Sequence, residues 1–400
     1  MTFKCRHCTE SLNDHILDLG HQPPSNNYLS KDQLDLAEFT YPLKVFICSK
    51  CGLVQLPEFL KPEELFTKNY AYFSSTSSSW CQHAKSFVEK AIKKLTLNKN
   101  SNVIEIASND GYLLQYIKKE NIPCIGIEPT KATALESRKK GINTIEEFFN
   151  YEMATSLEKA DLLIANNVVA HVPNINDFMK GICTALKSEG LASIEFPHLL
   201  NIVKYTQFDT IYHEHYSYLS LIAFKKIALH ANLDIIDVEE IPTHGGSLRV
   251  WLAHKNNFPI SNNVNKIIEI EKSLKLTSIE GFKNLQNNAK KIKIQLLNFL
   301  LKAKENNELV VGYGAAAKGN TLLNYCGINY DLLELIVDKS KSKQGLYMPG
   351  SHIPIIDLAK LEEIKPDKLL VLPWNLIKEI SYQQNIFNLY TAIPKLQLHK

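Results

Sequence analysis

The chain has 400 residues, with 45 lysines and arginines against 42 acidic residues, and 45% of its residues are apolar. This length exceeds one ordinary domain, so we expect two or three. A formal charge of +3 is too small to indicate nucleic-acid binding, which usually needs a strongly basic surface. The apolar runs are shorter than the roughly 20 residues of a membrane helix, and the N-terminus has no signal-peptide pattern. We therefore expect a cytoplasmic protein without a nucleic-acid or membrane partner.

Four of the eight cysteines form two pairs near the N-terminus, in Cys5-Arg-His-Cys8 and Cys48-Ser-Lys-Cys51. This spacing is typical of two knuckles that present thiolates to one tetrahedral zinc ion. Residues 9–47 must then fold into a loop or small sheet that joins the knuckles. Four thiolates close the coordination shell, so we expect the zinc to be structural. Disulfides are the alternative, which a reducing compartment disfavours.

After a connector that contains prolines, we place the first domain boundary near residue 75. Apolar spacing predicts a helix over 80–95, and residues 101–119 are typical of a strand, a polar turn and an amphipathic helix. Strands and helices continue to alternate through the segments IPCIGIEPT, NTIEEFF, DLLIANNVVAHV and GLASIEFPHLL. This alternation predicts a parallel, doubly wound α/β sheet.

The pattern changes over residues 262–308, where apolar residues advance by three and four. This spacing predicts one long helix with a single buried stripe. The stripe consists of Phe282, Leu285, Ala289, Ile292, Leu296 and Phe299. ELVVGYGAAAKGNTLLNYC then begins a second strand, glycine turn and helix, and LLELIVDKS and KPDKLLVLPWN continue the alternation. We therefore predict a small N-terminal domain over 1–75 and two α/β domains over 76–260 and 261–400.

The first candidate ligand site is the turn in VIEIASNDG, at the carboxyl end of a strand, where α/β sheets bind ligands. Glu128 ends the next strand, about 20 residues beyond the turn, where a carboxylate can accept both hydroxyls of a ribose. The turn lacks the G-x-G-x-x-G pattern that a dinucleotide pyrophosphate requires, so S-adenosylmethionine, which has no phosphate, fits better. Glu105 can then face the cationic amino-acid end of that cofactor. A plain turn without a cofactor is the alternative. The candidate cofactor-binding residues are Glu105, Ala107, Asn109, Gly111, Glu128 and Asn166.

The second candidate site gathers around a segment rich in tyrosine and histidine. His171 follows the strand that ends at Asn166, and FDTIYHEHYSY over 208–218 places Glu214 between two histidines without the H-E-x-x-H spacing of zinc proteases. A base beside a carboxylate is what removal of a proton alpha to a carbonyl requires. A polar loop that caps the sheet is the alternative. The glycine loop before Arg249 could close that arginine over an anionic substrate.

The third candidate site is the turn GYGAAAKGNT, which opens a helix, so that its amides and the helix dipole suit a phosphate. Lys318 adds positive charge, but it precedes the glycine, so the turn is not a Walker A loop. Asp338 ends the next strand and could bind a ribose, which makes NAD a competing ligand. The diphosphate of a sugar nucleotide would use both the turn and the lysine. The candidate substrate residues are Tyr313, Gly314, Ala315, Lys318, Gly319, Asn320 and Arg249.

Over nearly its whole length the chain resembles the zinc-containing sugar-nucleotide C-methyltransferase family. The motifs occur in family order: the two cysteine pairs, YAYFSSTSSSW, VIEIASNDGYLL, NNVVAHV, FDTIYHEHYSYLS, HGGSLRVW and GYGAAAKGNTLLNYCGI. The resemblance implies a zinc-binding domain, a central class I S-adenosylmethionine methyltransferase domain and a C-terminal Rossmann-like domain, with the sugar nucleotide between the last two. It also implies roles around the reacting sugar for Tyr72, His171, Tyr212, Glu214 and His215. Ala107 stands where many methyltransferases have glycine.

From this resemblance we expect methylation at C3 of a 4-keto-6-deoxyhexose linked to a nucleotide, with dTDP as the expected nucleotide. His215, assisted by Glu214, would take the C3 proton, and the enolate would attack the methyl group of S-adenosylmethionine. Tyr212 and His171 would hydrogen-bond the oxyanion. We expect a monomer that needs no metal besides the structural zinc. The rival functions are a zinc-containing NAD-dependent oxidoreductase and a non-catalytic zinc-ribbon binding protein.

Overall fold

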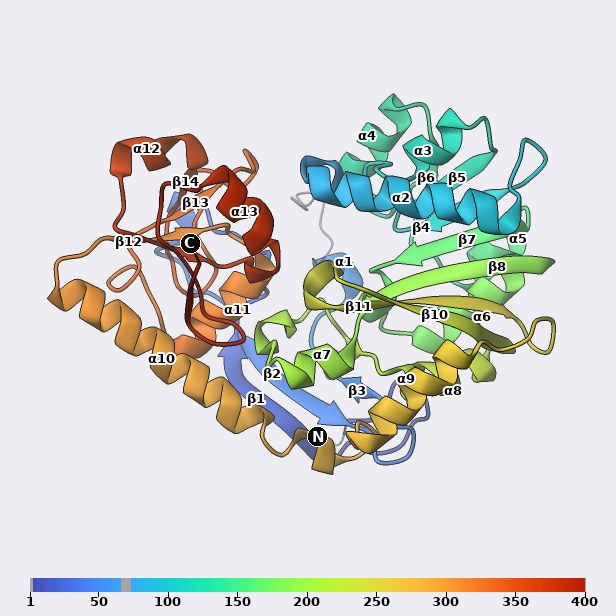
Figure 1. Ribbon diagram of the computed structural model, residues 1–400, viewed down its shortest axis with the longest axis horizontal. Helices are drawn as coiled ribbons and strands as arrows, with labels where there is room; N and C mark the ends of the chain where they lie inside the picture. The colour runs from blue at the N-terminus through green and yellow to red at the C-terminus, as the bar shows by residue number, and fades with distance from the viewer. Residues whose placement is uncertain (1–2, 66–72, 400) are drawn as a thin grey trace.

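The computed structural model describes residues 3–65 and 73–399, and these residues form sheets of four, seven and six strands (Figure 1). Tyr72, expected at the reacting sugar, lies outside the described residues. None of the helices within 3–65 and 73–399 is long and apolar enough to cross a membrane.

The four-stranded sheet joins the two zinc knuckles. Its strands, in spatial order, are β1 (Asp14–Gln22), β2 (Tyr41–Ile47), β3 (Val54–Gln55) and β9 (Ser217–Tyr218), all antiparallel. β1 and β2 pair along their length and bring the chain after the first knuckle back to the second. The small sheet expected between the knuckles is therefore confirmed. The fourth strand, β9, comes from a distant part of the chain, so residues just after His215 complete the N-terminal sheet.

The seven-stranded sheet has the order β10-β11-β8-β7-β4-β5-β6. Its strands are β4 (Val103–Ile106), β5 (Cys124–Ile127), β6 (Asn143–Ile145), β7 (Ala160–Asn166), β8 (Leu186–Pro197), β10 (Leu233–Ile241) and β11 (Ser247–His254). The pairs among β6, β5, β4, β7 and β8 are parallel, and β11 runs antiparallel to both of its neighbours. This order, with one reversed strand next to the edge, is the arrangement expected of a class I methyltransferase domain.

Helices cover both faces of this sheet. Successive side chains of β7 point to opposite faces, so Leu162 and Ile164 pack with α2 and α3, whereas Leu163 and Ala165 pack with α6 and α8. The doubly wound arrangement is therefore confirmed. The helices of this part are α2 (Ser78–Leu95), α3 (Leu114–Lys119), α4 (Lys131–Lys139), α5 (Tyr151–Ser156), α6 (Ile175–Ala185), α7 (Leu199–Lys204), α8 (Leu221–His230) and α9 (Asn262–Ser273). A short helix, α1 (Pro62–Leu65), precedes them.

The six-stranded sheet has the order β14-β13-β12-β15-β16-β17, parallel except for β17. Its strands are β12 (Val310–Tyr313), β13 (Ile336–Asp338), β14 (Ile355–Asp357), β15 (Lys368–Val371), β16 (Leu389–Thr391) and β17 (Gln397–His399), with helices α11 (Ala317–Cys326), α12 (Leu361–Ile364) and α13 (Ile377–Gln383). The strand order reverses at β12, between β13 and β15. Open α/β sheets bind ligands outside the carboxyl end of such a switch point.

The single long helix expected over 262–308 is wrong, because the chain breaks between α9 and α10 (Leu285–Glu305). Lys275 takes a left-handed backbone with φ 55°, and Phe282 belongs to a short 3-10 turn. The predicted stripe is nevertheless the buried face of α10 from Leu285 to Leu296. In Figure 1, α10 runs below the C-terminal sheet toward the blue strands β1 and β2, which lie between the two larger sheets. The domain boundaries near 75 and 260 stay a prediction.

Candidate active site

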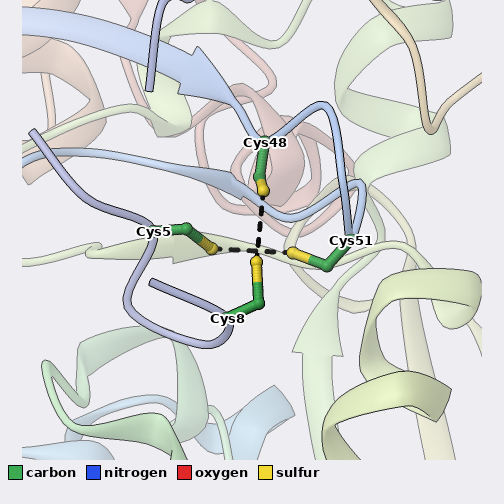
Figure 2. Close-up of side chains that lie close together, drawn as sticks. All are labelled: Cys5, Cys8, Cys48 and Cys51. Carbon is green, nitrogen blue, oxygen red and sulfur yellow. Dashed lines mark hydrogen bonds between the residues drawn. The ribbon is translucent and has the colours of Figure 1, made fainter. Parts of the chain in front are cut away.

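The four knuckle cysteines point toward one centre (Figure 2). Their Sγ atoms all lie within 4.8 Å of one another, with 3.6 Å between Cys5 and Cys51 and 3.5 Å between Cys8 and Cys48. Zinc–sulfur bonds of about 2.3 Å hold tetrahedral sulfurs about 3.8 Å apart, so this thiol set fits a zinc ion. Four sulfur ligands leave no open position, and the zinc that they would hold is structural.

The turn after β4 has an unusual backbone. Ala107, Asn109 and Gly111 all take left-handed conformations, with φ of 55°, 49° and 74°. Gly111 suits its left-handed backbone, and a side chain there would also bring its Cβ within 2.5 Å of Ile142 Cδ1. Ala107 adopts a conformation that glycine reaches without steric strain, which agrees with the resemblance to turns that carry glycine there.

Glu128 lies at the carboxyl end of β5, beside this turn. Its Oε2 accepts a hydrogen bond from the Asn109 amide at 2.9 Å, and its Oε1 accepts one from the Thr130 amide at 2.9 Å. Oε1 also accepts the Thr130 hydroxyl. A carboxylate has about four acceptor positions, so one is left for a ribose hydroxyl, and a second becomes available if the Thr130 hydroxyl donates to Thr133 instead. The sequence prediction placed this side chain at the turn, and the structure brings it there.

Two further cofactor candidates have different surroundings. Glu105 is 1% exposed, and its burial, with Asp110 and Glu128 nearby, raises the pKa of its carboxyl well above the usual range. Burial therefore disfavours the charged form of Glu105, which was expected to face the amino-acid end of the cofactor. Asn166 ends β7, and its Oδ1 is buried and has no hydrogen-bond partner in the described residues. The Glu128 carboxylate and Asn166 Oδ1 are acceptors that suit S-adenosylmethionine, a cofactor that has no phosphate to bind.

His215 is buried, and both of its ring nitrogens have partners. Nδ1 lies 2.9 Å from the Thr210 carbonyl oxygen, and Nε2 lies 2.9 Å from the Tyr212 hydroxyl. Because a carbonyl only accepts, Nδ1 carries the proton, and Nε2 is left with the lone pair of a base. Burial, with His171 nearby, holds the pKa of His215 well below its usual range, so the ring is neutral near pH 7.

His171 lies against His215, with 4.6 Å between the ring centroids. Its Nδ1 is 2.8 Å from the Glu214 carbonyl oxygen and therefore donates to it, which fixes the ring of His171 beside the 212–216 segment. Burial lowers the pKa of His171 to about 4. The structure thus brings together His171, Tyr212, Glu214 and His215, as expected.

The carboxylate of Glu214 was expected to accept a hydrogen bond from the His215 ring, but it binds another residue. Its partner is Asn26, whose Nδ2 lies 2.9 Å from Oε1 and 2.7 Å from Oε2. The His215 proton points at Thr210 instead. Burial raises the pKa of Glu214 to about 7, so at neutral pH this carboxyl is available in both protonation states. The prediction that Glu214 assists His215 through a direct hydrogen bond is therefore wrong.

His213, the other histidine of this segment, packs on the opposite side. Its ring lies 6.0 Å from that of Tyr41 in β2, and burial lowers its pKa to about 4. In an extended strand His213 and His215 would share one face, but residues 213 and 214 form a turn, in which the His215 amide donates to the Tyr212 carbonyl at 2.9 Å. The turn explains why the two histidines have different neighbours.

The turn after β12 lies at the switch point of the C-terminal sheet. Gly314 has φ 84°, and the Ala315 amide donates to Asp338 Oδ2 at 2.7 Å. The other oxygen of Asp338 accepts the Ser340 amide at 2.7 Å, so this carboxylate is already engaged by the backbone. Tyr28, from the N-terminal segment, donates its hydroxyl to the Ala315 carbonyl at 2.6 Å.

Three other substrate candidates lie around the same turn. Tyr313 is buried at the end of β12. Gly319 is needed for close packing, because an added Cβ would lie 2.8 Å from Leu372 Cβ. Asn320 is fully buried, and both polar atoms of its amide lack hydrogen-bond partners in the described part of the chain.

Lys318 reaches from α11 toward the central domain. Its Nζ lies 3.4 Å from the His244 carbonyl oxygen, 3.5 Å from Asn375 Oδ1 and 4.8 Å from the centre of the Trp374 ring. Trp374 in turn donates its Nε1 hydrogen to Asp209 Oδ2 at 2.6 Å. A lysine between the histidine-rich segment and the glycine turn can bind an anion that spans both.

The structure corrects the expectation for Arg249. Its side chain is 3% exposed, and its guanidinium group binds Glu195 at 2.5 Å and Glu239 at 3.3 Å. His83 pairs with the same Glu195 at 3.1 Å. Because both carboxylates occupy the guanidinium, Arg249 holds β11 to β8 and β10 and does not present a charge to a substrate.

The sequence prediction missed Asn26, Tyr28, Asp209 and Trp374. Each makes a contact that joins segments more than 150 positions apart, and no local spacing signals such a contact. The segment PPSNNYL, with its turn-forming residues, was the only local sign of a loop that could reach the site.

In comparisons with known proteins, the chain matches three family models. They are described as "Putative zinc binding domain" over residues 5–66, "Methyltransferase domain" over 80–238 and "C-methyltransferase C-terminal domain" over 242–391. A curated relative, C-methyltransferase NovU of Streptomyces niveus, is 29% identical over 382 residues, which cover 94% of this chain and 91% of the relative.

Solved structures match less than half of the chain. A methyltransferase from Clostridium acetobutylicum is 11% identical, with a TM-score of 0.37, over 44% of this chain and 92% of the other. Magnesium protoporphyrin IX methyltransferase from Synechocystis PCC 6803, with bound SAH, is 13% identical, with a TM-score of 0.35, over 43% of this chain and 83% of the other. The assignment rests on the family models and on NovU, which agree with the sheet order and the thiol cluster. The chain is an S-adenosylmethionine-dependent C-methyltransferase with an N-terminal zinc-binding domain.

Proposed function

We propose that this C-methyltransferase acts on a 4-keto-6-deoxyhexose linked to a nucleotide and adds the methyl group to C3, the carbon alpha to the ketone. The observation that carries the proposal is the neutral His215, which lies beside Tyr212 and His171. Lys318, which follows the C-terminal glycine turn, donates to the His244 carbonyl and so reaches the central domain. S-adenosylmethionine supplies the methyl group when bound.

The proposed base is His215. Its Nε2 lone pair takes the C3 proton, and the electrons of the C–H bond form an enolate. The enolate carbon would then bond to the methyl group as the bond from sulfur to that methyl group breaks, and the electrons of the broken bond would stay on sulfur. Burial suits this role, because it keeps the imidazole unprotonated until the substrate arrives. Tyr212 must yield its hydrogen bond to Nε2 during the step, which leaves its hydroxyl available to the enolate oxygen.

Enolate stabilisation has to supply much of the rate, because a positioned base typically contributes only about 10²–10⁴-fold. Tyr212 is the proposed donor to the developing oxyanion. The donor role expected of His171 is not part of the proposal, because the one proton of its neutral ring lies on Nδ1 and is donated to the Glu214 carbonyl. The ketone is essential to this chemistry, since an ordinary sugar C–H bond is far too weak an acid. Tyr72 keeps its proposed place at the sugar by the resemblance alone.

The proposed nucleotide site is the turn after β12. Its amides lie at the start of α11, and Lys318 provides a cation whose pKa burial lowers. A diphosphate has the charge to pair with that lysine. NAD would use Asp338 as its ribose ligand, and this carboxylate, like that of Glu128, accepts two backbone amides and has acceptor positions left. We favour the diphosphate of a sugar nucleotide because it uses both the turn and Lys318.

The test measures exchange of the C3 proton with deuterated water, with the keto sugar nucleotide bound and methyl donor absent. His215→Asn should abolish both exchange and methyl transfer while the sugar nucleotide and S-adenosylmethionine still bind. His213→Asn is the matched control, because its ring packs on Tyr41, and it should retain exchange. Exchange at the wild-type rate in His215→Asn would remove His215 as the base. Absence of exchange and methylation with every 4-keto sugar nucleotide offered to the wild type would overturn the substrate class.

A further inference from the structure

We propose that Arg6, which lies inside the first zinc knuckle, positions the two loops that carry His171 and His215. The N-terminal zinc-binding segment would then act on catalysis through this side chain. The catalytic consequence rests on the proposed function, whereas the positioning of the loops can be measured by itself.

The knuckle fixes the backbone of Arg6. Its amide donates to Gln55 Oε1 at 2.9 Å, and Gln55 Nε2 lies 3.2 Å from the Sγ of Cys5, the neighbouring zinc-ligand candidate. Gln55 belongs to β3, which follows the second knuckle directly. The base of the Arg6 side chain is therefore held by both halves of the proposed zinc site.

The guanidinium group of Arg6 leaves the knuckle and enters the central domain. It donates to the Pro173 carbonyl oxygen at 2.9 Å and to the Leu56 carbonyl oxygen, and its central carbon lies 5.2 Å from the centre of the Tyr216 ring. Pro173 lies two residues after His171, and Tyr216 directly follows His215. One side chain therefore contacts both loops that carry the proposed catalytic histidines.

The same loops are bonded to each other and to the N-terminal sheet at this point. The Tyr216 amide donates to the Ala170 carbonyl at 2.8 Å, and the Leu56 amide donates to the Tyr216 carbonyl at 3.0 Å. Strands β3 and β9 continue this pairing through Val54 and Tyr218. Arg6 lies where these three segments meet, so its loss frees the loops to move relative to each other.

The planar guanidinium suits this position better than any other side chain, because it can serve two carbonyls and a ring face together. Without it, the carbonyl oxygens of Pro173 and Leu56 lose a buried donor. A displacement of catalytic groups by about 1 Å can cost about 10²-fold in rate, so a modest shift of the His215 loop has a large effect.

The experiment compares Arg6→Met with Asn176→Ala in the full-length, zinc-loaded protein. Asn176 is a matched control, because it belongs to helix α6 and makes two hydrogen bonds to His7 of the same knuckle, at 2.7 and 2.8 Å. Three quantities are measured for each variant: affinity and stoichiometry for S-adenosylmethionine, amide hydrogen exchange over 212–218, and kcat per cofactor-binding site.

Arg6→Met should speed amide exchange over 212–218 and lower kcat by about 10²-fold per cofactor site, with cofactor affinity unchanged. Asn176→Ala should leave these amides and kcat within about twofold of the wild type. Arg6→Lys should recover part of the kcat, because it retains a cation that can reach one carbonyl. If Arg6→Met does not fold, Arg6→Lys alone should show intermediate amide protection and kcat.

Wild-type amide protection and kcat in either Arg6 variant would overturn the positioning role. An equal loss of kcat in Asn176→Ala would also overturn it, since the knuckle would then act only through general stability. If the wild type methylates no keto sugar, the proposed function fails, yet the amide exchange over 212–218 still decides whether Arg6 holds the loops.

Discussion

Asn26 binds the carboxylate of Glu214 through a single amide nitrogen, 2.9 Å from Oε1 and 2.7 Å from Oε2. Asn26 belongs to the segment between β1 and β2, so the zinc-binding part of the chain reaches the middle of the proposed catalytic segment. Burial raises the pKa of Glu214 to about 7, and the hydrogen bonds from Asn26 oppose this rise because they favour the charged form.

Asn26→Leu should therefore raise the pKa of Glu214 further, since it removes the donor and leaves the burial. One hydrogen bond to a charged group is worth about 1.5–3 kcal/mol, which corresponds to roughly one to two pH units. If the ionised Glu214 is the active form, kcat/KM should fall at pH 7 and recover at higher pH. The measurement is the pH dependence of kcat/KM.

Tyr28→Phe is the control for this prediction, because Tyr28 lies in the same segment and donates to Ala315 instead of Glu214. It should change the rate without moving the acidic limb of the profile. An acidic limb in Asn26→Leu that coincides with that of the wild type would show that the Glu214 ionisation does not control the reaction.

Glu128→Gln should weaken S-adenosylmethionine binding by about 10–10²-fold, because a neutral amide accepts the ribose hydroxyls less strongly than a carboxylate. Glutamine at position 128 also accepts the hydrogen bond from the Asn109 backbone amide less strongly, which makes the turn less rigid. Calorimetric titration should show the loss for S-adenosylmethionine and an unchanged affinity for the sugar nucleotide. Unaltered cofactor affinity would remove Glu128 from the site.

Zinc removal should affect both the N-terminal sheet and the proposed catalytic segment. We expect one tightly bound zinc per chain, and chelation should disorder β1 to β3, because metal binding and folding are coupled in such sites. Since β3 pairs with β9, amide protection over 217–218 should fall as well, whereas S-adenosylmethionine should still bind. Elemental analysis and amide hydrogen exchange check this. Less than half an equivalent of zinc in protein purified without chelator would contradict it.

The sequence predicts the elements that local spacing encodes and misses what long-range packing decides. Alternating strands and helices indicated the two α/β sheets, and the cysteine pairs indicated the thiol cluster. The periodicity of α10 could not show where that helix begins, because the residues before it, including the left-handed Lys275, carry no spacing that signals a break. The burial of Arg249 against Glu195 depends on β8 and β11 lying side by side, which only the folded sheet reveals.

Ala107 is a further example. The sequence indicated that it lies in the cofactor turn, but only the structure shows its left-handed backbone. A left-handed conformation costs a residue with a Cβ roughly 1–2 kcal/mol, and glycine avoids this cost. Glycine also loses more conformational entropy on folding, which costs about 0.4–1 kcal/mol relative to alanine. The balance predicts that Ala107→Gly stabilises the protein by up to about 1 kcal/mol, or leaves it unchanged, and retains cofactor binding.

Ala132→Gly in α4 provides the comparison for this last prediction, because a helical alanine gains nothing from the change and should be destabilised by about 1 kcal/mol. Both free energies of unfolding come from denaturant titration with S-adenosylmethionine absent, so that cofactor binding does not add to the folded state. If Ala107→Gly destabilised the protein as much as Ala132→Gly, the left-handed conformation at residue 107 would be wrong. If it were stabilising but bound the cofactor less tightly, the strained alanine would serve to hold the turn rigid for its ligand, and calorimetric titration of the same two variants distinguishes these outcomes.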